Sequence, residues 1–271
     1  MPELPEVETT VRGLEPVLAG QRLTTVEPRR ADLRKAIPAD LRQRMQGATV
    51  TALRRRAKYG MIDTDRGDTM IFHLGMSGRW RVDPSEPLVH DHLLLETGAG
   101  RSAVLNDARR FGFLDLVRTE ALDAYPPFAA MGPEPLGEAF TAAYLLRALD
   151  GRAAPIKAML LDQRLVAGLG NIYVCEALHL ARIAPGRAGG QIGRARLALL
   201  VDAVRAVLLA AIGVGGSSLR DYVRPSGELG YFSKQWRAYG REGLACECGG
   251  TIARRVESGR STFWCPACQR G

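Results

Sequence analysis

The chain has 271 residues, of which 46% are hydrophobic, so it can bury one large core or two compact ones. It contains no apolar run of membrane-spanning length, and its acidic start, MPELPE, lacks the basic and apolar regions of a signal peptide. We therefore expect a cytoplasmic protein that makes no membrane contact. Lys and Arg number 37 against 29 Asp and Glu, a formal net charge of +8. This excess favours a polyanionic partner, although it also fits a basic protein without one.

Apolar residues in 6–18 recur at helical spacing, and Pro5 suits a first helical turn, so this segment is predicted to be a helix. From about 22 to 118, short apolar or alternating runs are broken by Gly, Asp and Pro, which is typical of strands joined by tight turns. The segment 131–140 is rich in Pro and Gly and is predicted to be a linker. Helical patterns follow at 154–163, directly after the glycine-rich turn 167–171, and at 194–212.

The C-terminal part begins with a loop at 224–233, where Gly and Ser residues predict mobility, and closes with a Cys-bearing tail at 246–268. Four of the five cysteines lie in this tail, which in a reducing cell indicates metal ligation rather than disulfides. The predicted order is one helix, a strand-rich region, a linker, a helical region and a small Cys-rich appendix. This order indicates an α+β protein.

The N-terminus offers an unusual nucleophile, because removal of Met1 would make Pro2 a secondary amine. An α-amino group titrates at about pH 8, so a useful fraction is unprotonated at neutral pH. Attack of a secondary amine on a sugar C1′ gives an iminium, which is an electron sink and acidifies the neighbouring C2′ proton. Glu3 and Glu6 lie close by and could carry protons, although both also suit a helix start.

The cysteine tail has the spacing Cys246-x-Cys248-x16-Cys265-x2-Cys268, whose second half is a usual zinc turn. The first half is short. In an extended strand the first two cysteines would share a face, and a local bulge could bring both sulfurs to one metal. We predict one structural Zn²⁺ held by all four cysteines, with a distorted or partly empty site as the alternative. Cys175 lies in a helical pattern and is expected to pack rather than to ligate.

Short blocks of distinctive sequence extend along the whole chain: PELPEVET (2–9), RRAKY (55–59), HLGMSG (73–78), HDH (90–92), DARRFG (107–112), MGPEPL (131–136), GLGNIYVCEAL (168–178), GELGYF (227–232) and GRSTFWCPACQ (259–269). In sequence and in order, these blocks resemble those of the formamidopyrimidine-DNA glycosylases. Each block alone is weak, but together they are highly specific. The resemblance implies a bacterial, monomeric enzyme that acts on double-stranded DNA containing oxidised bases or abasic sites.

The same resemblance implies a fold and its boundaries. An N-terminal two-sheet β-sandwich with flanking helices would occupy 1–131 and carry the catalytic groups. A linker and a helix–two-turn–helix domain would follow at 132–235, and a zinc-bearing β-hairpin at 236–271. The loop 224–233 matches the segment that closes over the extruded lesion in this family.

The catalytic roles implied by the resemblance begin with Pro2, which forms the Schiff base. Glu3 is the acid that assists base loss and ring opening, and Glu6 is a supporting carboxylate. Lys58 matches a lysine with a role in β-elimination, although RRRAK is also a charge run of the kind that usually faces solvent. Arg260, between the Cys pairs, matches an arginine that contacts phosphates around the lesion and assists δ-elimination.

Enzymes that act on a base must take it out of the stack, and the vacated space needs a filler. Met76, Arg109 and Phe111 match the family's filler residues: two apolar wedges and a donor to the orphaned base. The alternative is that Met76 and Phe111 are core residues. The remaining positions that match DNA contacts are His73, His90, Arg152, Lys157 and Asn171. For the two histidines the alternative is a structural role, and for Asn171 it is a helix N-cap.

These matches predict excision of oxidised purines, chiefly 8-oxoguanine and formamidopyrimidines, followed by β,δ-elimination through the Schiff base. Endonuclease VIII enzymes, which act mainly on oxidised pyrimidines, typically have Gly where this chain has Leu4. Leu4, VET at 7–9 and ARRFG favour the purine branch. The alternatives are a pyrimidine-lesion glycosylase and a non-catalytic zinc-dependent protein that only recognises damaged DNA.

Overall fold

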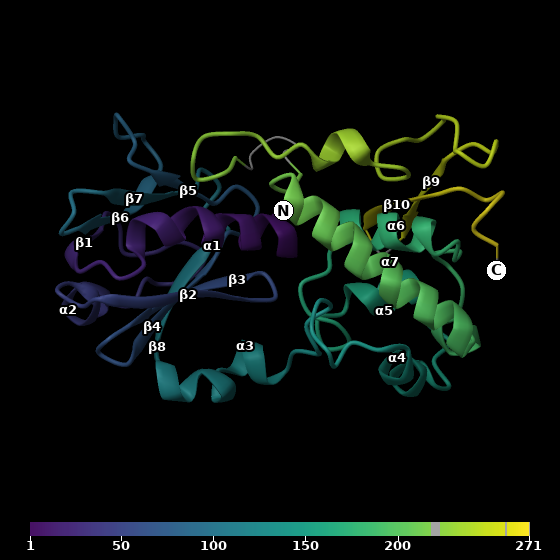
Figure 1. Ribbon diagram of the computed structural model, residues 1–271, viewed down its shortest axis with the longest axis horizontal. Coiled ribbons are helices and arrows are strands. Elements are labelled where there is room, and N and C mark those ends of the chain that lie inside the picture. Colours follow the sequence, from purple (N-terminus) through teal and green to yellow (C-terminus); the bar gives the residue numbers. More distant parts are fainter. Residues whose placement is uncertain (218–222, 258, 271) are drawn as a thin grey trace. The chain divides into compact units, whose positions relative to one another are not determined.

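The computed structural model describes residues 1–217, 223–257 and 259–270 (Figure 1). The chain forms two compact units. Unit 1 comprises Met1–Ala129 and Ile212–Ser233, and unit 2 comprises Ala130–Ala211 and Lys234–Gly271. Among the described residues, no helix is both long and apolar enough to cross a membrane. The segments predicted from the sequence, 1–131, 132–235 and 236–271, stay a prediction.

Unit 1 is built on two four-stranded antiparallel sheets. The first has the order β2-β3-β4-β8, with β2 at Val50–Arg56, β3 at Tyr59–Thr64, β4 at Asp68–His73 and β8 at Phe113–Arg118. The second has the order β1-β6-β7-β5, with β1 at Leu23–Pro28, β6 at Asp91–Thr97, β7 at Ser102–Asn106 and β5 at Arg79–Val82. The prediction of a strand-rich region in this part of the chain is confirmed.

The core of unit 1 lies between the sheets and against helix α1 (Leu4–Leu18). Phe72 of the first sheet and Trp80 of the second meet edge to face, with ring centroids 5.4 Å apart. Helix α1 packs against both sheets (Figure 1). It does so through a fully buried stripe that includes Val7, Leu14 and Leu18. The apolar residues whose spacing predicted a helix at 6–18 are therefore the residues that pack into the core of unit 1.

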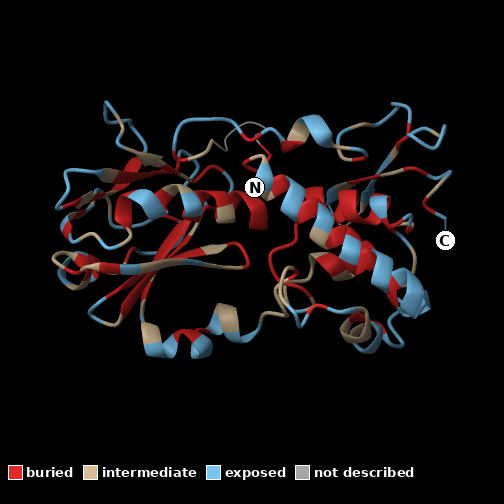
Figure 2. Cartoon of the chain, in the orientation of Figure 1, coloured by how far each residue is buried: buried red, intermediate tan, exposed pale blue. Residues whose placement is uncertain are grey.

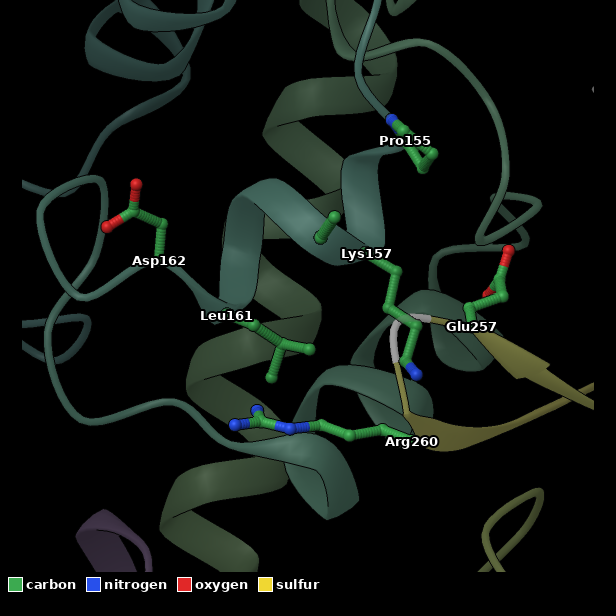
Figure 3. Close-up of a pocket in the computed structure, with 7 residues that line it drawn as sticks. Pro155, Lys157, Leu161, Asp162, Glu257 and Arg260 are labelled. Atoms are coloured by element: carbon green, nitrogen blue, oxygen red, sulfur yellow. The ribbon is translucent and has the colours of Figure 1, made fainter.

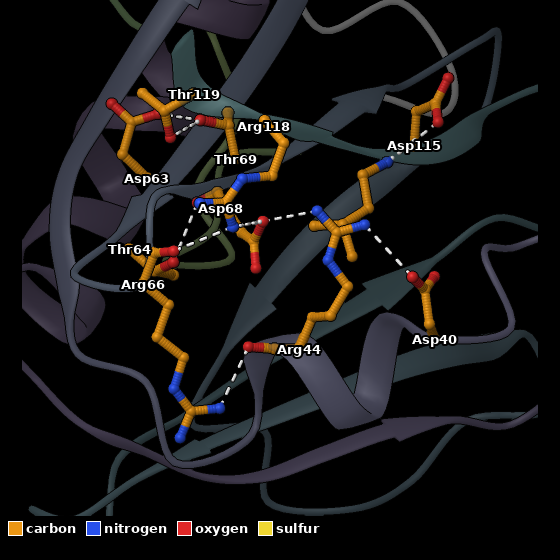
Figure 4. Close-up of polar contacts among 11 residues, drawn as sticks. Asp40, Arg44, Asp63, Thr64, Arg66, Asp68, Thr69, Asp115, Arg118 and Thr119 are labelled. Carbon is orange, nitrogen blue, oxygen red and sulfur yellow. Dashed lines mark hydrogen bonds and ion pairs between the residues drawn. The ribbon is translucent and has the colours of Figure 1, made fainter. Parts of the chain in front are cut away.

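One end of the first sheet is tied by a carboxylate on β4 (Figure 4). Asp68 is buried, and its Oδ1 accepts hydrogen bonds from Arg44 at 2.5 Å and from Arg118 at 2.8 Å. Arg44 comes from the short helix α2 (Leu41–Met45), and Arg118 ends β8. The bond to Arg44, followed by that to Arg118, lowers the pKa of Asp68. This cluster joins three elements that are distant in sequence, and no pattern in the chain predicts it.

Unit 2 is helical and ends in a hairpin. Its elements are α4 (Ala142–Leu149), α5 (Ile156–Leu161), α6 (Asn171–Leu180), most of α7 (Arg194–Gly213) and the hairpin of β9 (Ala253–Glu257) with β10 (Arg260–Trp264). Figure 2 shows α6 buried along nearly its whole length, whereas α7 keeps an exposed side. A helix enclosed in this way can position side chains in several directions.

The helices predicted in unit 2 are confirmed, and so is the α+β class with two N-terminal sheets, a helical middle and a terminal hairpin. Short helical segments were missed: α2, α4, α3 (Pro126–Ala129) and the 3₁₀ turns at 119–124, 189–191 and 232–235. Except for α4, these segments are two turns or shorter and carry too few apolar positions to show a helical period. The eight residues of α4 do have a helical apolar pattern, so this helix could have been predicted.

Candidate functional site

The N-terminus is held as a capped helix start. Pro2, Glu3 and Glu6 are all buried, and Glu3 is the N-cap of α1. The Glu3 backbone N–H donates to Glu6 Oε2 at 2.8 Å, as in a capping box. The positive end of the helix dipole is thus directed at Pro2, where it favours negative charge.

The second oxygen of Glu6 reaches a segment 211 residues away. Glu6 Oε1 accepts the Ser217 backbone N–H at 2.8 Å. Gly216 has φ +81°, and a Cβ there would lie 2.9 Å from the same oxygen, so only glycine fits this approach. Glu6 therefore fixes the helix start and the chain around Ser217 relative to each other, which makes it a positioning residue.

Lys58 lies in the two-residue turn that joins β2 to β3, after Ala57 with φ 53°. Its side chain is 8% exposed, so the solvated-face alternative is wrong for this residue. Two positions before the turn, Arg55 Nε pairs with Glu8 Oε2 of α1 at 2.8 Å. This ion pair holds the end of the hairpin against the first turns of α1 and brings Lys58 to the same end of the helix as Glu3.

His73 ends β4 opposite Tyr59, next to the Lys58 turn. Burial, followed by the positive charges of Lys58 and Arg34, lowers the pKa of His73 to about 4, so the ring is neutral at neutral pH. The Gly75 backbone N–H donates to His73 Nδ1 at 3.0 Å, which leaves the ring proton on Nε2. A neutral ring with an Nε2–H donor suits an anionic oxygen.

Met76 and Phe111 are not core residues, because they are 37% and 42% exposed. The core alternative is therefore wrong for both. The Arg109 guanidinium lies over the Phe111 ring, 4.9 Å from its centroid. Gly75 has φ 61°, and a Cβ there would lie 2.2 Å from the Phe111 carbonyl carbon. The loops that carry these three side chains therefore touch backbone to backbone.

A buried pair, which the sequence did not indicate, locks the two loops together. Ser77 Oγ donates to Asp107 Oδ1 at 2.6 Å and accepts the Arg109 backbone N–H at 3.0 Å. Asp107 is fully buried, and its Oδ2 accepts the Gly112 backbone N–H at 2.8 Å. One carboxylate thus holds the Met76 turn and both ends of the segment that carries Phe111.

His90 is exposed and lies at the base of the same loop, where its carbonyl oxygen accepts the Asp107 backbone N–H at 3.0 Å. Its neighbour His92 is buried, and His92 Nε2 lies 2.9 Å from the Asp107 carbonyl oxygen. In the HDH block, therefore, His92 is structural and His90 is available to a ligand.

In unit 2, two predicted residues, Lys157 and Asn171, bind the hairpin strand that carries a third, Arg260. Figure 3 shows Lys157 and Arg260. Lys157 Nζ on α5 donates to Thr262 Oγ1 at 2.7 Å and to the Ser261 carbonyl oxygen at 3.3 Å. Asn171 Nδ2, at the first residue of α6, donates to the same carbonyl at 2.8 Å. Lys157 and Asn171 therefore fix the strand that carries Arg260.

Lys157 and Arg260 line one pocket of about 370 Å³, together with Pro155, Ala158, Leu161, Asp162 and Glu257. The Arg260 side chain extends from the hairpin toward Leu161 (Figure 3). Within the part of the chain that the structure describes, Arg260 has no carboxylate partner, and Asn171 Oδ1 is buried without a hydrogen bond. Asn171 is not the N-cap of α6, which is Gly170. Arg152 is exposed, precedes α5 and does not line this pocket.

The four cysteines of the tail form one cluster. Their Sγ atoms all lie within 4.8 Å of one another, with Cys246 and Cys268 4.0 Å apart and Cys248 and Cys265 3.5 Å apart. Four thiolates around zinc at about 2.3 Å are about 3.8 Å apart, so the cluster fits a tetrahedral ion. The expectation of one structural Zn²⁺ is confirmed, and the distorted alternative is not needed.

The short first pair closes by a turn, and not by the local bulge that the sequence left as a possibility. The Gly249 N–H donates to the Cys246 carbonyl oxygen at 2.9 Å, and the Cys246 N–H donates to the Gly250 carbonyl oxygen at 2.8 Å. Gly249 has φ +85°, which lets the chain turn back within one residue of Cys248. Cys175 is fully buried in α6 and is not in the cluster, as expected.

Sequence reasoning missed residues that hold these groups in place: Ser77, Asp107, Gln163 and Glu176. Gln163 donates to the Leu169 carbonyl oxygen at 2.9 Å and accepts the Gly168 N–H at 2.8 Å, so it cradles the glycine-rich turn before α6. The only signal for such residues is a polar side chain within an apolar or glycine-rich block.

These features define a two-unit protein with a zinc hairpin and with exposed basic and apolar side chains presented on rigid loops. Three family models match it: the formamidopyrimidine-DNA glycosylase N-terminal domain at 1–114, the H2TH domain of the same enzymes at 131–223, and a zinc finger found in FPG and IleRS at 247–271. A formamidopyrimidine-DNA glycosylase of Rhizorhabdus wittichii is 69% identical over the full length of both chains.

Solved structures agree. The MutM (Fpg) protein of Thermus thermophilus shares 40% identity at a TM-score of 0.86, covering 99% of this chain and 98% of that one. The Lactococcus lactis Fpg in complex with abasic-site DNA shares 34% identity at a TM-score of 0.91 over the whole of both chains. The chain belongs to the formamidopyrimidine-DNA glycosylase family.

Proposed function

We propose that this protein is a base-excision-repair DNA glycosylase that removes oxidised purines, chiefly 8-oxoguanine and formamidopyrimidines, and then cuts the strand as a lyase. The observation that carries the proposal is the start of α1, where Pro2 and Glu3 are buried at the positive end of a capped helix, and where the Arg55–Glu8 ion pair holds the hairpin that carries Lys58. A binding protein has no use for this arrangement. Related proteins bound to DNA containing an abasic site or Fapy-dG support the substrate class.

The chemistry begins with removal of Met1, which frees the Pro2 amine. The amine attacks C1′ of the damaged nucleotide, and the C1′–base bond breaks while Glu3 supplies protons for base loss and sugar ring opening. The resulting iminium withdraws electrons from C2′, so loss of a C2′ proton expels the 3′-phosphate, and a second elimination expels the 5′-phosphate. The Lys58 ammonium, buried in its turn, stabilises negative charge that develops during elimination.

DNA binding draws on both units. The exposed Met76 and Phe111 fill the space left by the extruded nucleotide, and Arg109 donates to its former partner base. His73 donates its Nε2–H to a phosphate, and His90 lies at the base of the same loop.

In unit 2, Lys157, Asn171 and Arg260 supply phosphate contacts, because a helix N-terminus favours an anion and so does the Arg260 guanidinium, which has no carboxylate partner among the described residues. Arg152 adds an exposed charge before α5. Zinc holds the hairpin in the shape that presents Arg260. We place the enzyme on chromosomal DNA in the bacterial cytoplasm.

The test compares single-turnover cleavage of duplexes that carry 8-oxoguanine opposite cytosine or thymine glycol opposite adenine. We expect faster cleavage of the first, with products flanking a one-nucleotide gap and ending in phosphates on both sides. Glu3→Gln is the matched control, because it keeps the size of the side chain but removes the acid. Faster cleavage of thymine glycol would favour a pyrimidine-lesion enzyme, and tight binding without cleavage would favour a binding protein.

A further inference from the structure

The geometry points to His179 as an additional member of the zinc centre: it donates its Nε2–H to the Cys246 thiolate and thereby positions that ligand. His179 Nε2 lies 3.3 Å from Cys246 Sγ, within reach of an N–H···S hydrogen bond. The two residues are 67 positions apart in the chain, and no motif links them. The role does not depend on the lesion chemistry proposed above.

The direction of the hydrogen bond follows from the chemistry of the ligand. A cysteine bound to zinc is a thiolate, which has no proton and can only accept. The proton must therefore be on Nε2 of His179, and Nδ1 carries a lone pair. Nδ1 is buried and has no hydrogen-bond partner among the described residues. The protein thus tolerates an unsatisfied buried nitrogen, which is unfavourable, in order to place this donor beside the metal ligand.

The donor is held rigidly. His179 is 7% exposed, in the last turn of α6, a helix enclosed by its surroundings. One turn earlier, Glu176 accepts the backbone N–H groups of Arg237, Ala238 and Tyr239 at 2.9, 3.0 and 2.7 Å. These three bonds clamp the chain that leads into the cysteine turn onto the same helix. The distance from His179 to Cys246 is therefore set by the fold of unit 2.

The short spacing explains why Cys246 needs an outside partner. A two-residue spacer lets a zinc turn wrap the ion, whereas Cys246 and Cys248 have a single residue between them. His179 holds Sγ toward the metal before the ion arrives, which reduces the ordering cost of binding. Once zinc is bound, the N–H also disperses charge in a centre where four thiolates exceed the charge of the ion.

The experiment measures zinc release from the full-length holoprotein into excess chelator. His179→Phe keeps an aromatic ring but removes the donor, and His179→Gln restores an amide N–H at nearly the position of Nε2. Outer partners of metal ligands contribute about 10- to 100-fold to metal affinity, so we expect release from His179→Phe to be faster by that factor. His179→Gln should stay within about threefold of the wild type. Leu180→Ala, at an exposed position of the same helix, is the control.

A spectroscopic readout separates the hydrogen bond from packing. In the cobalt-substituted protein, loss of an N–H···S bond raises the energy of the thiolate lone pair and shifts the sulfur-to-cobalt charge-transfer band to longer wavelength. We expect this shift in His179→Phe and not in His179→Gln. If His179→Phe does not fold, His179→Leu takes its place. The proposal would be overturned if the variant without the donor released zinc at the wild-type rate. It would also be overturned if that variant and His179→Gln lost zinc equally fast.

Discussion

Replacement of Ser77 by alanine tests whether the filler loops act as one body. Ser77 Oγ donates to the fully buried Asp107 carboxylate at 2.6 Å, and a hydrogen bond to a charged group contributes about 1.5–3 kcal/mol. The Arg109 N–H, which also uses Ser77 Oγ, lies on an exposed residue and can find water instead. We therefore expect Ser77→Ala to lower the free energy of unfolding by about 2 kcal/mol.

The functional consequence should be selective. If the Met76 turn and the Phe111 loop lose their common anchor, extrusion of a paired base slows, and a barrier higher by about 1.4 kcal/mol lowers the rate about tenfold. Excision of 8-oxoguanine from duplex DNA, measured in single turnover, should show this loss. Borohydride trapping on an abasic site in single-stranded DNA needs no extrusion and should be nearly unchanged. Ser85→Ala, at an exposed serine of unit 1, is the control. Equal loss on both substrates, or no loss on either, would refute the reasoning.

Three further results are expected. Glu176→Ala removes the buried carboxylate that accepts three backbone N–H groups, of which only the Ala238 N–H belongs to a buried residue, and should cost about 3 kcal/mol in urea unfolding, whereas a loss below about 1 kcal/mol would contradict the clamp. The pKa of His73 is about 4 in the folded state, below its usual 6.5, so its contribution to stability is complete above pH 6.5 and is lost as pH falls toward 4. In the wild type, the free energy of unfolding should therefore fall by up to about 3 kcal/mol across this pH window because of His73. This dependence on pH should flatten in His73→Gln and not in His90→Gln. Asp68→Asn should lower the thermal midpoint by removing a buried anion between Arg44 and Arg118. Because the pKa of Asp68 is lowered in the folded state, the wild type should lose this contribution to stability as pH falls below about 4, whereas Asp68→Asn has no such contribution to lose.

Much of the fold could be predicted because each long element carries its own period. Val7, Leu14 and Leu18 lie at helical spacing and are the residues that α1 buries. The helix predicted at 154–163 is shorter in the structure, Ile156–Leu161, because the backbone turns at Asp162, whose carbonyl oxygen accepts the Leu165 N–H at 2.9 Å. Its apolar spacing could not reveal where that turn begins.

The candidate site was predicted only where a side chain is itself part of a recognised block. Lys58, Met76 and Phe111 were proposed from such blocks, and burial or exposure then decided between their alternatives. The residues that hold them were not foreseen, because their partners are distant in sequence: Asp107 is 30 positions from Ser77. The four zinc ligands were predicted correctly, but the turn between the first two cysteines was not, because the segment closes on Gly249 with positive φ and not in strand geometry.

The central claim is that Pro2 is the nucleophile, and borohydride trapping on a duplex carrying 8-oxoguanine opposite cytosine tests it most directly. The zinc-loaded wild-type protein should form a covalent adduct with the DNA, and Pro2→Gly should form little or none, because a primary amine on a more flexible N-terminus replaces the rigid secondary one. Absence of an adduct from the wild type despite tight binding to the duplex, or undiminished trapping by Pro2→Gly, would contradict the account.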